Sequence, residues 1–247
     1  MPELRQYHCH RAGTPLPIDG TLTHPAWTAA AWTGDFVDIR GLDHPMPRFP
    51  TRAKLLWDDE FLYVGAYLEE PHVWGTLSEH NSRLYEENNF EVFLDPDGDG
   101  ENYYEFEIGP LGTIWELTLP KPYDLGGEAI DPTNLPGLRT AVVVNGTLND
   151  PADTDRGWSV EVAFPWAALA AYNPGRATPP RSGDEWRMNL MRVEWPHQIV
   201  DGAYRRGTGE DYWVWSPQYE VNMHRPEHWG VLEFCVGSHL PDGDPAS

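Results

Sequence analysis

Apolar and polar residues alternate with a period of two through most of the chain, and this pattern constrains the fold more than any other feature. Glu105 and Glu107 alternate with Phe106 and Ile108, and Phe61–Tyr67 is a run of aromatic and aliphatic residues, and both are typical of β-strands. Turn signals such as Pro110-Leu111-Gly112 and Asn145-Gly146 separate these runs. We expect strands at residues 53–57, 61–67, 89–95, 103–109, 113–119, 139–145, 157–164, 185–194, 211–215 and 229–236. Only Pro165–Ala170 has a helical pattern.

About ten short strands with almost no helix predict an all-β fold, an antiparallel and jelly-roll-like β-sandwich. No shift of composition divides the 247 residues, so we predict a single domain, residues 1–247. Its core spans residues 14–236, and a polar tail, 237–247, is expected to be disordered. Long segments rich in Pro, Gly and charge are expected to form loops along one rim, at 38–50, 121–137 and 196–210.

The charge balance excludes several partners. The formal net charge is −22, with only 17 Lys and Arg, whereas nucleic acids and anionic membranes are bound through clusters of cationic side chains. Neutral or cationic partners are therefore expected, and the sequence does not predict the oligomeric state. The first residues show no signal peptide and no segment is apolar enough to span a membrane, so the chain as written is predicted to be cytoplasmic, while a secreted mature form stays open.

Two cysteines, Cys9 and Cys235, lie near opposite ends of the chain. A disulfide is conceivable if the first and last strands are neighbours with Cα atoms within about 7 Å. The alternative is two reduced thiols that are mostly buried, and this is the reading we prefer.

The segment Asp95-Pro96-Asp97-Gly98-Asp99-Gly100 repeats the first half of a calcium-binding loop. The second half of the motif is missing, because Phe106 stands where a bidentate Glu is needed. In a β context the remaining oxygens can come from backbone carbonyls or a nearby carboxylate such as Glu101. From the residues alone, a calcium site formed by Asp95, Asp97, Asp99 and Glu101 and a solvated acidic turn both stay open.

Carboxylates also alternate with apolar residues on the strands that flank this loop. Glu91 and Phe93 share one face of their strand, and Glu105 and Glu107 share one face of the next. Two carboxylates at a cleft can hydrolyse a glycosidic bond, or they can form the polar face of a sheet or hydrogen-bond a sugar. No nucleophile motif, phosphate loop or zinc-ligand spacing accompanies them, so we favour a non-catalytic role.

Aromatic residues next to polar ones could supply a platform for a sugar, whose C–H face packs on aromatic rings. The candidates outside the carboxylate strands are Trp74, Tyr85, Trp115 and the pair Trp213 and Trp215. Trp213 and Trp215 point the same way in a strand, so both belong to the core or both line a face.

Six segments of the chain, taken together, resemble the family 9 carbohydrate-binding modules over residues 14–236. They are "PIDGTLTHPAW" (17–27), "AKLLWDDEFLYVGAYLEEP" (53–71), "NNFEVFLDPDGDGENYYEFEIGPLGTIWEL" (88–117), "GWSVEVAFPWAAL" (157–169), "GDEWRMNLMRVEW" (183–195) and "WVWSPQYEVNMHRPEHWGVLEF" (213–234). The resemblance implies a β-sandwich with structural calcium and a site that holds a sugar between two aromatic rings beside a Glu.

Carried over by position, the resemblance makes Glu91 the sugar-contacting Glu and places Tyr85 at the first stacking ring. Met223 falls near the second stacking Trp, and Glu107 falls near an expected Arg, so the sugar preference of the family does not carry over to this chain. Further walls could come from Trp115, Trp215 or Trp74.

The function predicted from the sequence is non-catalytic binding of a mono- or oligosaccharide by a calcium-stabilised β-sandwich. The alternatives are a glycoside-processing enzyme that uses Glu91 with Glu105 or Glu107, and a protein-interaction or scaffold module whose rim loops bind a protein.

Overall fold

The computed structural model describes residues 4–237, which are built mainly from strands. The predicted tail, 237–247, lies outside the described residues apart from Gly237. The strands are β1 (Gln6–Arg11), β2 (Val37–Asp38), β3 (Thr51–Trp57), β4 (Phe61–Glu69), β5 (Asn89–Asp95), β6 (Tyr103–Ile108), β7 (Ile114–Leu119), β8 (Arg139–Asn145), β9 (Gly157–Pro165), β10 (Glu185–Glu194), β11 (His197–Val200), β12 (Ala203–Arg206), β13 (Asp211–Val214) and β14 (Gly230–Cys235). The helical elements are α1 (Pro25–Ala29), η1 (Leu84–Glu86), η2 (Tyr123–Leu125), α2 (Trp166–Leu169), η3 (Ala170–Tyr172) and η4 (Pro226–His228).

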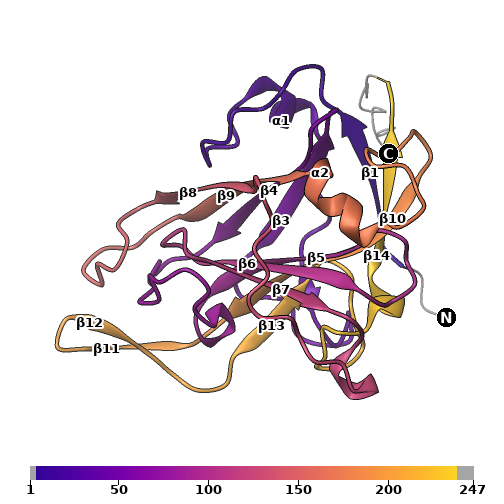
Figure 1. The fold of residues 1–247 in the computed structure, drawn as a ribbon. Coiled ribbons are helices and arrows are strands. Elements are labelled where there is room, and N and C mark those ends of the chain that lie inside the picture. Colours follow the sequence, from indigo (N-terminus) through magenta and orange to yellow (C-terminus); the bar gives the residue numbers. More distant parts are fainter. Residues whose placement is uncertain (1–3, 238–247) are drawn as a thin grey trace.

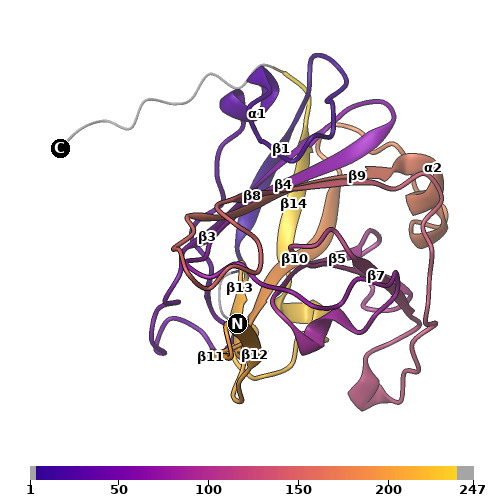
Figure 2. The same cartoon turned by 90° about the vertical axis from the view of Figure 1, so that its left-hand side faces the viewer.

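One large sheet forms both layers of the sandwich. Its strand order is β7-β6-β5-β10-β14-β1-β3-β4-β9-β8, and β13 pairs with β10 and with β2 outside this path. The sheet curls so that its β8-β9-β4-β3 half lies across from its β7-β6-β5 half, with β14 and β1 joining the two (Figures 1 and 2). The all-β sandwich expected from the alternation is therefore confirmed.

The sheet is mixed rather than purely antiparallel. β1 runs parallel to both of its neighbours, β14 and β3, while the other pairings in the sheet are antiparallel. The strand alternation that predicts the sheet carries no information about strand direction, and a strand contributed by one end of the chain has no hairpin to force an antiparallel pairing.

The main core lies between the two halves of the curled sheet. Leu55, Val64 and Val160 point inward from one half, and Val92 and Phe106 point inward from the other. All five side chains are fully buried, which is the outcome expected for the apolar face of alternating strands. The opposite face of the β7-β6-β5-β10 half is therefore free to carry other chemistry.

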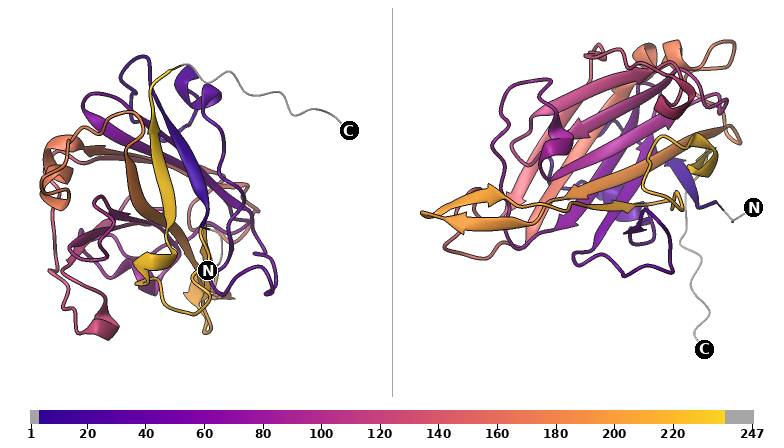
Figure 3. Two further views of the ribbon diagram at one scale, coloured as in Figure 1. Left: turned by 90° about the vertical axis from the view of Figure 1, so that its right-hand side faces the viewer. Right: turned by 90° about the horizontal axis from the view of Figure 1, so that it is seen from below.

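Two segments differ from the expectations. The predicted loop 196–210 contains the hairpin β11–β12, which projects from the body of the protein (Figure 3). Its strands have exposed positions on both faces, so the core-facing alternation that reveals the other strands is absent. The short helix α1 was not expected, although Pro25 stands at its first turn and the His24 side chain accepts the amide hydrogen bond of Ala26.

The first and last strands are neighbours, yet the two cysteines are free. Cys9 pairs with Phe234 and Cys235 pairs with His10, so the cysteines are one position out of register. Side chains alternate between faces along a strand, and Cys9 is fully buried in the core whereas Cys235 is not. Within residues 4–237, no helix is both long and apolar enough to cross a bilayer.

Candidate functional site

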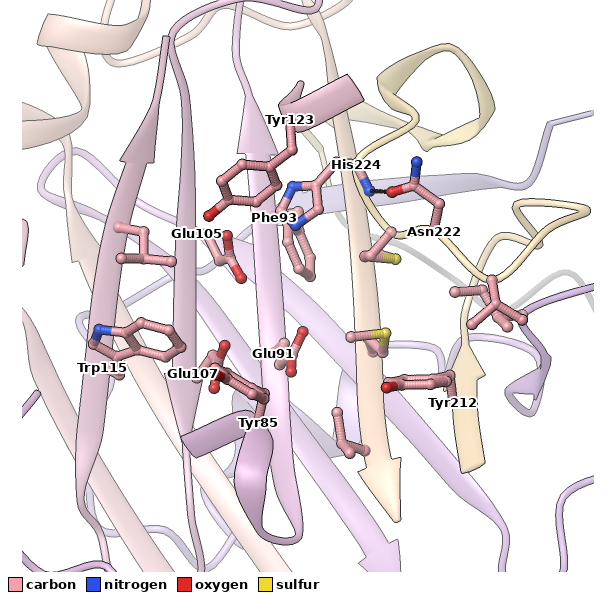
Figure 4. Close-up of a pocket in the computed structure, with 16 residues that line it drawn as sticks. Tyr85, Glu91, Phe93, Glu105, Glu107, Trp115, Tyr123, Tyr212, Asn222 and His224 are labelled. Atoms are coloured by element: carbon pink, nitrogen blue, oxygen red, sulfur yellow. Dashed lines mark hydrogen bonds between the residues drawn. The ribbon is translucent and has the colours of Figure 1, made fainter. Parts of the chain in front are cut away.

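A cavity of about 320 Å³ opens on the outward face of β7, β6, β5 and β10. Alternation along these strands explains its lining: Glu91 and Phe93 face the cavity from β5, while Val92 and Leu94 between and beyond them face the core. Figure 4 shows the carboxylates of Glu91, Glu105 and Glu107 together on the floor of this cavity.

The strand register brings the three glutamates together. Glu91 on β5 lies directly opposite Glu107 on β6, and Glu105 lies two residues before Glu107 on the same strand. Carboxylate oxygens from all three lie within 4.8 Å of one another. The side chains are between 1% and 5% exposed, so bulk water screens their repulsion poorly. Like charges directly opposite each other destabilise a pair of strands, and Glu91 and Glu107 form such a pair, with Glu105 diagonal to Glu91.

The cavity therefore favours protonated carboxyl groups. Burial, reinforced by Glu105, raises the pKa of Glu91 well above its ordinary value. Burial, followed by the charges of Glu91 and Glu105, does the same to the pKa of Glu107. Burial raises the pKa of Glu105 to about 8. In the empty cavity a charge on any one of these groups opposes a charge on the others.

Hydrogen bonds compensate only part of this cost. Asn89 donates to Glu107 Oε2 at 2.9 Å. Both carboxylate oxygens of Glu91, and Oε2 of Glu105, are buried without a hydrogen-bond partner among the described residues. Buried polar atoms of a folded protein are nearly always satisfied, so three orphaned acceptors at the floor of one cavity indicate a missing donor.

Aromatic rings form the walls. Tyr85 on η1 contacts Trp115 on β7, with ring centroids 5.6 Å apart. The indole Nε1 of Trp115 donates to Asp131 at 2.9 Å, which fixes the ring beside the glutamates. Tyr123 from η2 and Tyr212 from β13 line the other sides (Figure 4). Tyr85 and Tyr123 are 42% and 46% exposed, so their faces are available to a ligand.

The far wall comes from the segment between β13 and η4. It contributes Asn222, Met223 and His224, and Met223 is nearly buried. The imidazole of His224 lies 2.9 Å from the hydroxyl of Tyr103, and burial lowers its pKa to about 4. His224 is therefore neutral at physiological pH and adds no positive charge to the cavity.

Five of the seven predicted ligand-binding residues meet in this cavity: Tyr85, Glu91, Glu107, Trp115 and Met223. Trp215 lies elsewhere, in the main core. Its indole ring packs closely against Gly230, because a Cβ at position 230 would stand only 2.4 Å from the ring. Trp213 is buried in the same core, so neither of these two Trp side chains supplies a wall. Trp74 is also buried and stacks with Tyr204, with centroids 6.4 Å apart, at a separate hollow.

Sequence reasoning missed three residues that reach the site from outside its floor strands. Tyr123, Tyr212 and His224 come from three segments that the strand pattern leaves unconnected. Glu105 was recognised only as one of a pair of carboxylates. Its alternation with Phe106 and Glu107 is the signal that could have placed it in the site, because it predicts that Glu105 and Glu107 share a face.

The acidic loop lies at the far end of β5 from the cavity floor. The carboxylates of Asp95, Asp97 and Asp99 offer oxygens within 4.8 Å of one another, and Glu101 is not part of that group. The loop is folded around Asp95, whose two carboxylate oxygens accept the amide hydrogen bonds of Gly98 and Gly100 at 3.0 and 2.9 Å. Burial raises the pKa of Asp95 to about 7. Three converging carboxylates suit a hard cation that takes oxygen ligands.

Solved structures share this fold. A carbohydrate binding module family 9 from Caldicellulosiruptor kristjanssonii, solved in complex with cellotriose, aligns over 98% of this chain and 100% of its own, with 16% identity and a TM-score of 0.60. The same coverage, identity and TM-score hold for the complex of that module with glucose. A putative carbohydrate-binding protein from Bacteroides uniformis aligns over 94% of this chain and 97% of its own, with 16% identity and a TM-score of 0.63.

Curated relatives match a shorter part. Exoglucanase XynX of Acetivibrio thermocellus is 29% identical over 121 residues, which is 49% of this chain and 9% of that protein. Endo-1,4-beta-xylanase A of Thermoanaerobacterium saccharolyticum is 28% identical over 120 residues, again 9% of its length. The chain thus corresponds to a small part of these large enzymes.

The family profile described as carbohydrate family 9 binding domain-like matches residues 18–235, which include both halves of the sheet, the acidic loop and the aromatic cavity. The chain belongs to the carbohydrate family 9 binding domain-like family.

Proposed function

We propose that the protein binds a mono- or oligosaccharide, without catalysing a reaction, in the cavity floored by Glu91, Glu105 and Glu107. The observation that carries this proposal is the meeting of orphaned carboxylate oxygens with exposed aromatic faces in one hollow. A sugar offers both complements, because its hydroxyls donate hydrogen bonds and its C–H faces pack on rings. The relatives solved with cellotriose and glucose support this choice of ligand class.

In this proposal each side chain has a distinct role. Glu91 accepts hydrogen bonds from ligand hydroxyls through the two oxygens that no protein group satisfies. Tyr85 and Trp115 form one stacking surface, and Tyr123 and Tyr212 close the remaining sides. A hydrogen bond to a charged group contributes about 1.5–3 kcal/mol, and the entropy lost on capture offsets much of the total. We expect dissociation constants of roughly 10 μM to 1 mM.

The geometry favours binding over glycoside hydrolysis. Glycosidases place their two carboxyl groups on either side of the scissile bond, about 5–5.5 Å or 6.5–9.5 Å apart. Here Glu91 and Glu107 stand side by side on paired strands, with oxygens within 4.8 Å, and so approach a ligand from the same side. Incubation with a panel of glycans should release no reducing ends; steady release that Glu91→Gln abolishes would establish the enzymatic alternative.

Calorimetry against glucose, cellotriose and a panel of other glycans tests the binding proposal. We expect weak saturable binding that Tyr85→Ala and Glu91→Ala each abolish. Tyr219→Ala is the matched control, because Tyr219 is similarly exposed, at 46%, but does not line the cavity. If no glycan gives heat, or if both site variants bind a glycan with the affinity of the wild type, a protein-interaction module becomes the better interpretation.

We further propose that calcium binds the acidic loop as a structural ion. Asp95, Asp97 and Asp99 would supply three oxygens, and backbone carbonyls, water or Glu101 would complete the six to eight that calcium takes. A ligand held at a hundred times its dissociation constant stabilises a fold by about 2.7 kcal/mol. Melting in millimolar calcium should therefore occur several degrees above melting in chelator. Asp97→Asn with Asp99→Asn should remove the difference, and identical wild-type melts would contradict the proposal.

A further inference from the structure

The cavity contains three carboxyl groups that face no cationic side chain among the residues that line it. Three carboxyl groups converge within 4.8 Å, and both oxygens of Glu91 lack partners within residues 4–237 although the residue is only 1% exposed. A neutral sugar would satisfy these acceptors with hydroxyls but would not allow the three groups to ionise together, because ionised glutamates this close repel one another.

No lysine or arginine within residues 4–237 lines the cavity. The nearest cation along the floor strands, Arg192 on β10, lies between the cavity-lining Met191 and Val193 and so points to the opposite face. There it is committed to Glu70 and Glu194, at 2.7 Å from an oxygen of each. His224 is neutral and held by Tyr103. Without a ligand, burial keeps these carboxyl groups protonated, and a positive charge that would hold them ionised has to come from the ligand.

Two kinds of ligand carry such a charge, a metal ion and a protonated amine. A bare divalent ion would use the carboxylates but would leave the aromatic walls and most of a 320 Å³ cavity unused. A primary ammonium has three N–H donors for three carboxyl groups, and a cation also gains from nearby aromatic faces such as Tyr85 and Trp115. When the ammonium is carried on a sugar ring, the ring fills the space between the walls.

From this geometry, and resting on the proposed carbohydrate binding, we propose that the site selects an amino sugar, whose ammonium group is held by Glu91, Glu105 and Glu107. A binder of neutral sugars would not show this preference, because the cavity selects a sugar that carries a positive charge on the substituent of one ring carbon. The opposite selection should apply to sugar acids, which the same carboxylates repel.

Competitive calorimetry with glucosamine, N-acetylglucosamine and glucose tests this proposal, at a pH where the amine is protonated and at low ionic strength. The three sugars share a ring and differ at one substituent. We expect glucosamine to bind at least tenfold more tightly than glucose and N-acetylglucosamine, with the advantage reduced in high salt. Glu105→Gln and Glu91→Gln should each lower the ratio of the glucosamine affinity to the glucose affinity. Glu161→Gln, a buried glutamate on β9 far from the cavity, should not change that ratio.

The outcomes separate the two proposals. Glucose binding as tight as glucosamine binding would overturn the amino-sugar preference and leave carbohydrate binding intact, whereas no binding of any glycan would remove both. A third arm uses calcium or magnesium chloride alone, on the Asp97→Asn and Asp99→Asn variant. Displacement of glucosamine by the metal at low millimolar concentration would assign the glutamates to a cation and overturn the inference. Circular dichroism and thermal melts establish that each variant is folded.

Discussion

Two groups of buried carboxylates lie on opposite sides of β10, whose Arg192 points away from the cavity, and their surroundings differ. Glu70 and Glu194 surround Arg192, which donates to an oxygen of each at 2.7 Å, and the amide of His72 donates to Glu70 as well. Glu91, Glu105 and Glu107 have one donor, Asn89, and no cation. The first group is complete within the described protein, while three acceptor oxygens of the second have no donor among the described residues.

This contrast shows that burial of charge alone does not mark a functional site. Burial and the neighbouring Glu194 raise the pKa of Glu70 to about 8, even though Arg192 acts in the opposite direction. A raised carboxyl pKa is therefore common to both groups. What distinguishes the cavity is that its acceptors lack donors and its walls are aromatic and exposed. Orphaned acceptors beside an open hollow are a better indicator of a site than the pKa itself.

The largest effect on stability should follow from removing Arg192, the cation that pairs with Glu70 and Glu194. Arg192→Met leaves Glu70 and Glu194 buried without their counter-charge, and breaking a buried pair costs about 3–5 kcal/mol. A domain of this size loses about 2–4 °C in Tm for each kcal/mol, so we expect a decrease of at least about 6 °C. Arg48→Met is the control, because Arg48 and its partner Asp211 are exposed and such pairs contribute about 0–1 kcal/mol. Equal decreases in Tm in the two variants would show that the buried group does not depend on its cation more than an exposed ion pair does.

A substitution in the cavity should change the stability in the opposite direction. Glu91→Gln removes a buried carboxyl group whose pKa is raised by folding, and each unit of that increase costs about 1.4 kcal/mol above both pKa values. We expect the variant to be more stable than the wild type at pH 8 by about 1–3 kcal/mol in the absence of ligand. Chemical denaturation measures the difference. Glu161→Gln should destabilise instead, because Glu161 accepts the amides of Asp19 and Leu22 at 3.0 and 2.8 Å.

The stability that Glu91→Gln adds relative to the wild type should increase with pH. Folding raises the pKa values of Glu91, Glu105 and Glu107, so the folded state binds more protons than the unfolded state above about pH 4.5. This contribution to stability is full below pH 4.5 and is lost as pH rises toward the folded-state values, about 8 for Glu105. The advantage of Glu91→Gln should grow by up to about 1.4 kcal/mol per pH unit across this window. A difference that is constant with pH would mean that Glu91 is not the titrating group.

The sequence predicted the strands of the site well because alternation is a local property. It placed β5, Asn89–Asp95, at its observed bounds and put Glu91 on one face with Phe93. It could not reveal that Glu91 and Glu107 lie directly opposite each other, because register depends on how two strands pair.

Distant segments were harder still. The positions of Tyr123 and His224 depend on how their loops cross the sheet, and no periodicity encodes that path. The same limit made Trp215 a plausible wall, since a buried and a ligand-facing Trp have the same local sequence signal.

The smallest effect on stability should come from Tyr85, at the rim of the same cavity. Its side chain is 42% exposed and its ring contacts Trp115, so Tyr85→Ala should change the free energy of unfolding by only about 0.5 kcal/mol. Its effect on ligand binding should be much larger, at least tenfold, because the ring supplies a stacking face that Trp115 alone, 6% exposed, offers only in part. Parallel melts and titrations of Tyr85→Ala and Tyr219→Ala measure both quantities. If Tyr85→Ala lowered the free energy of unfolding by several kcal/mol, or left the sugar affinity unchanged, Tyr85 would have a structural role like that of Arg192 rather than a role in ligand binding.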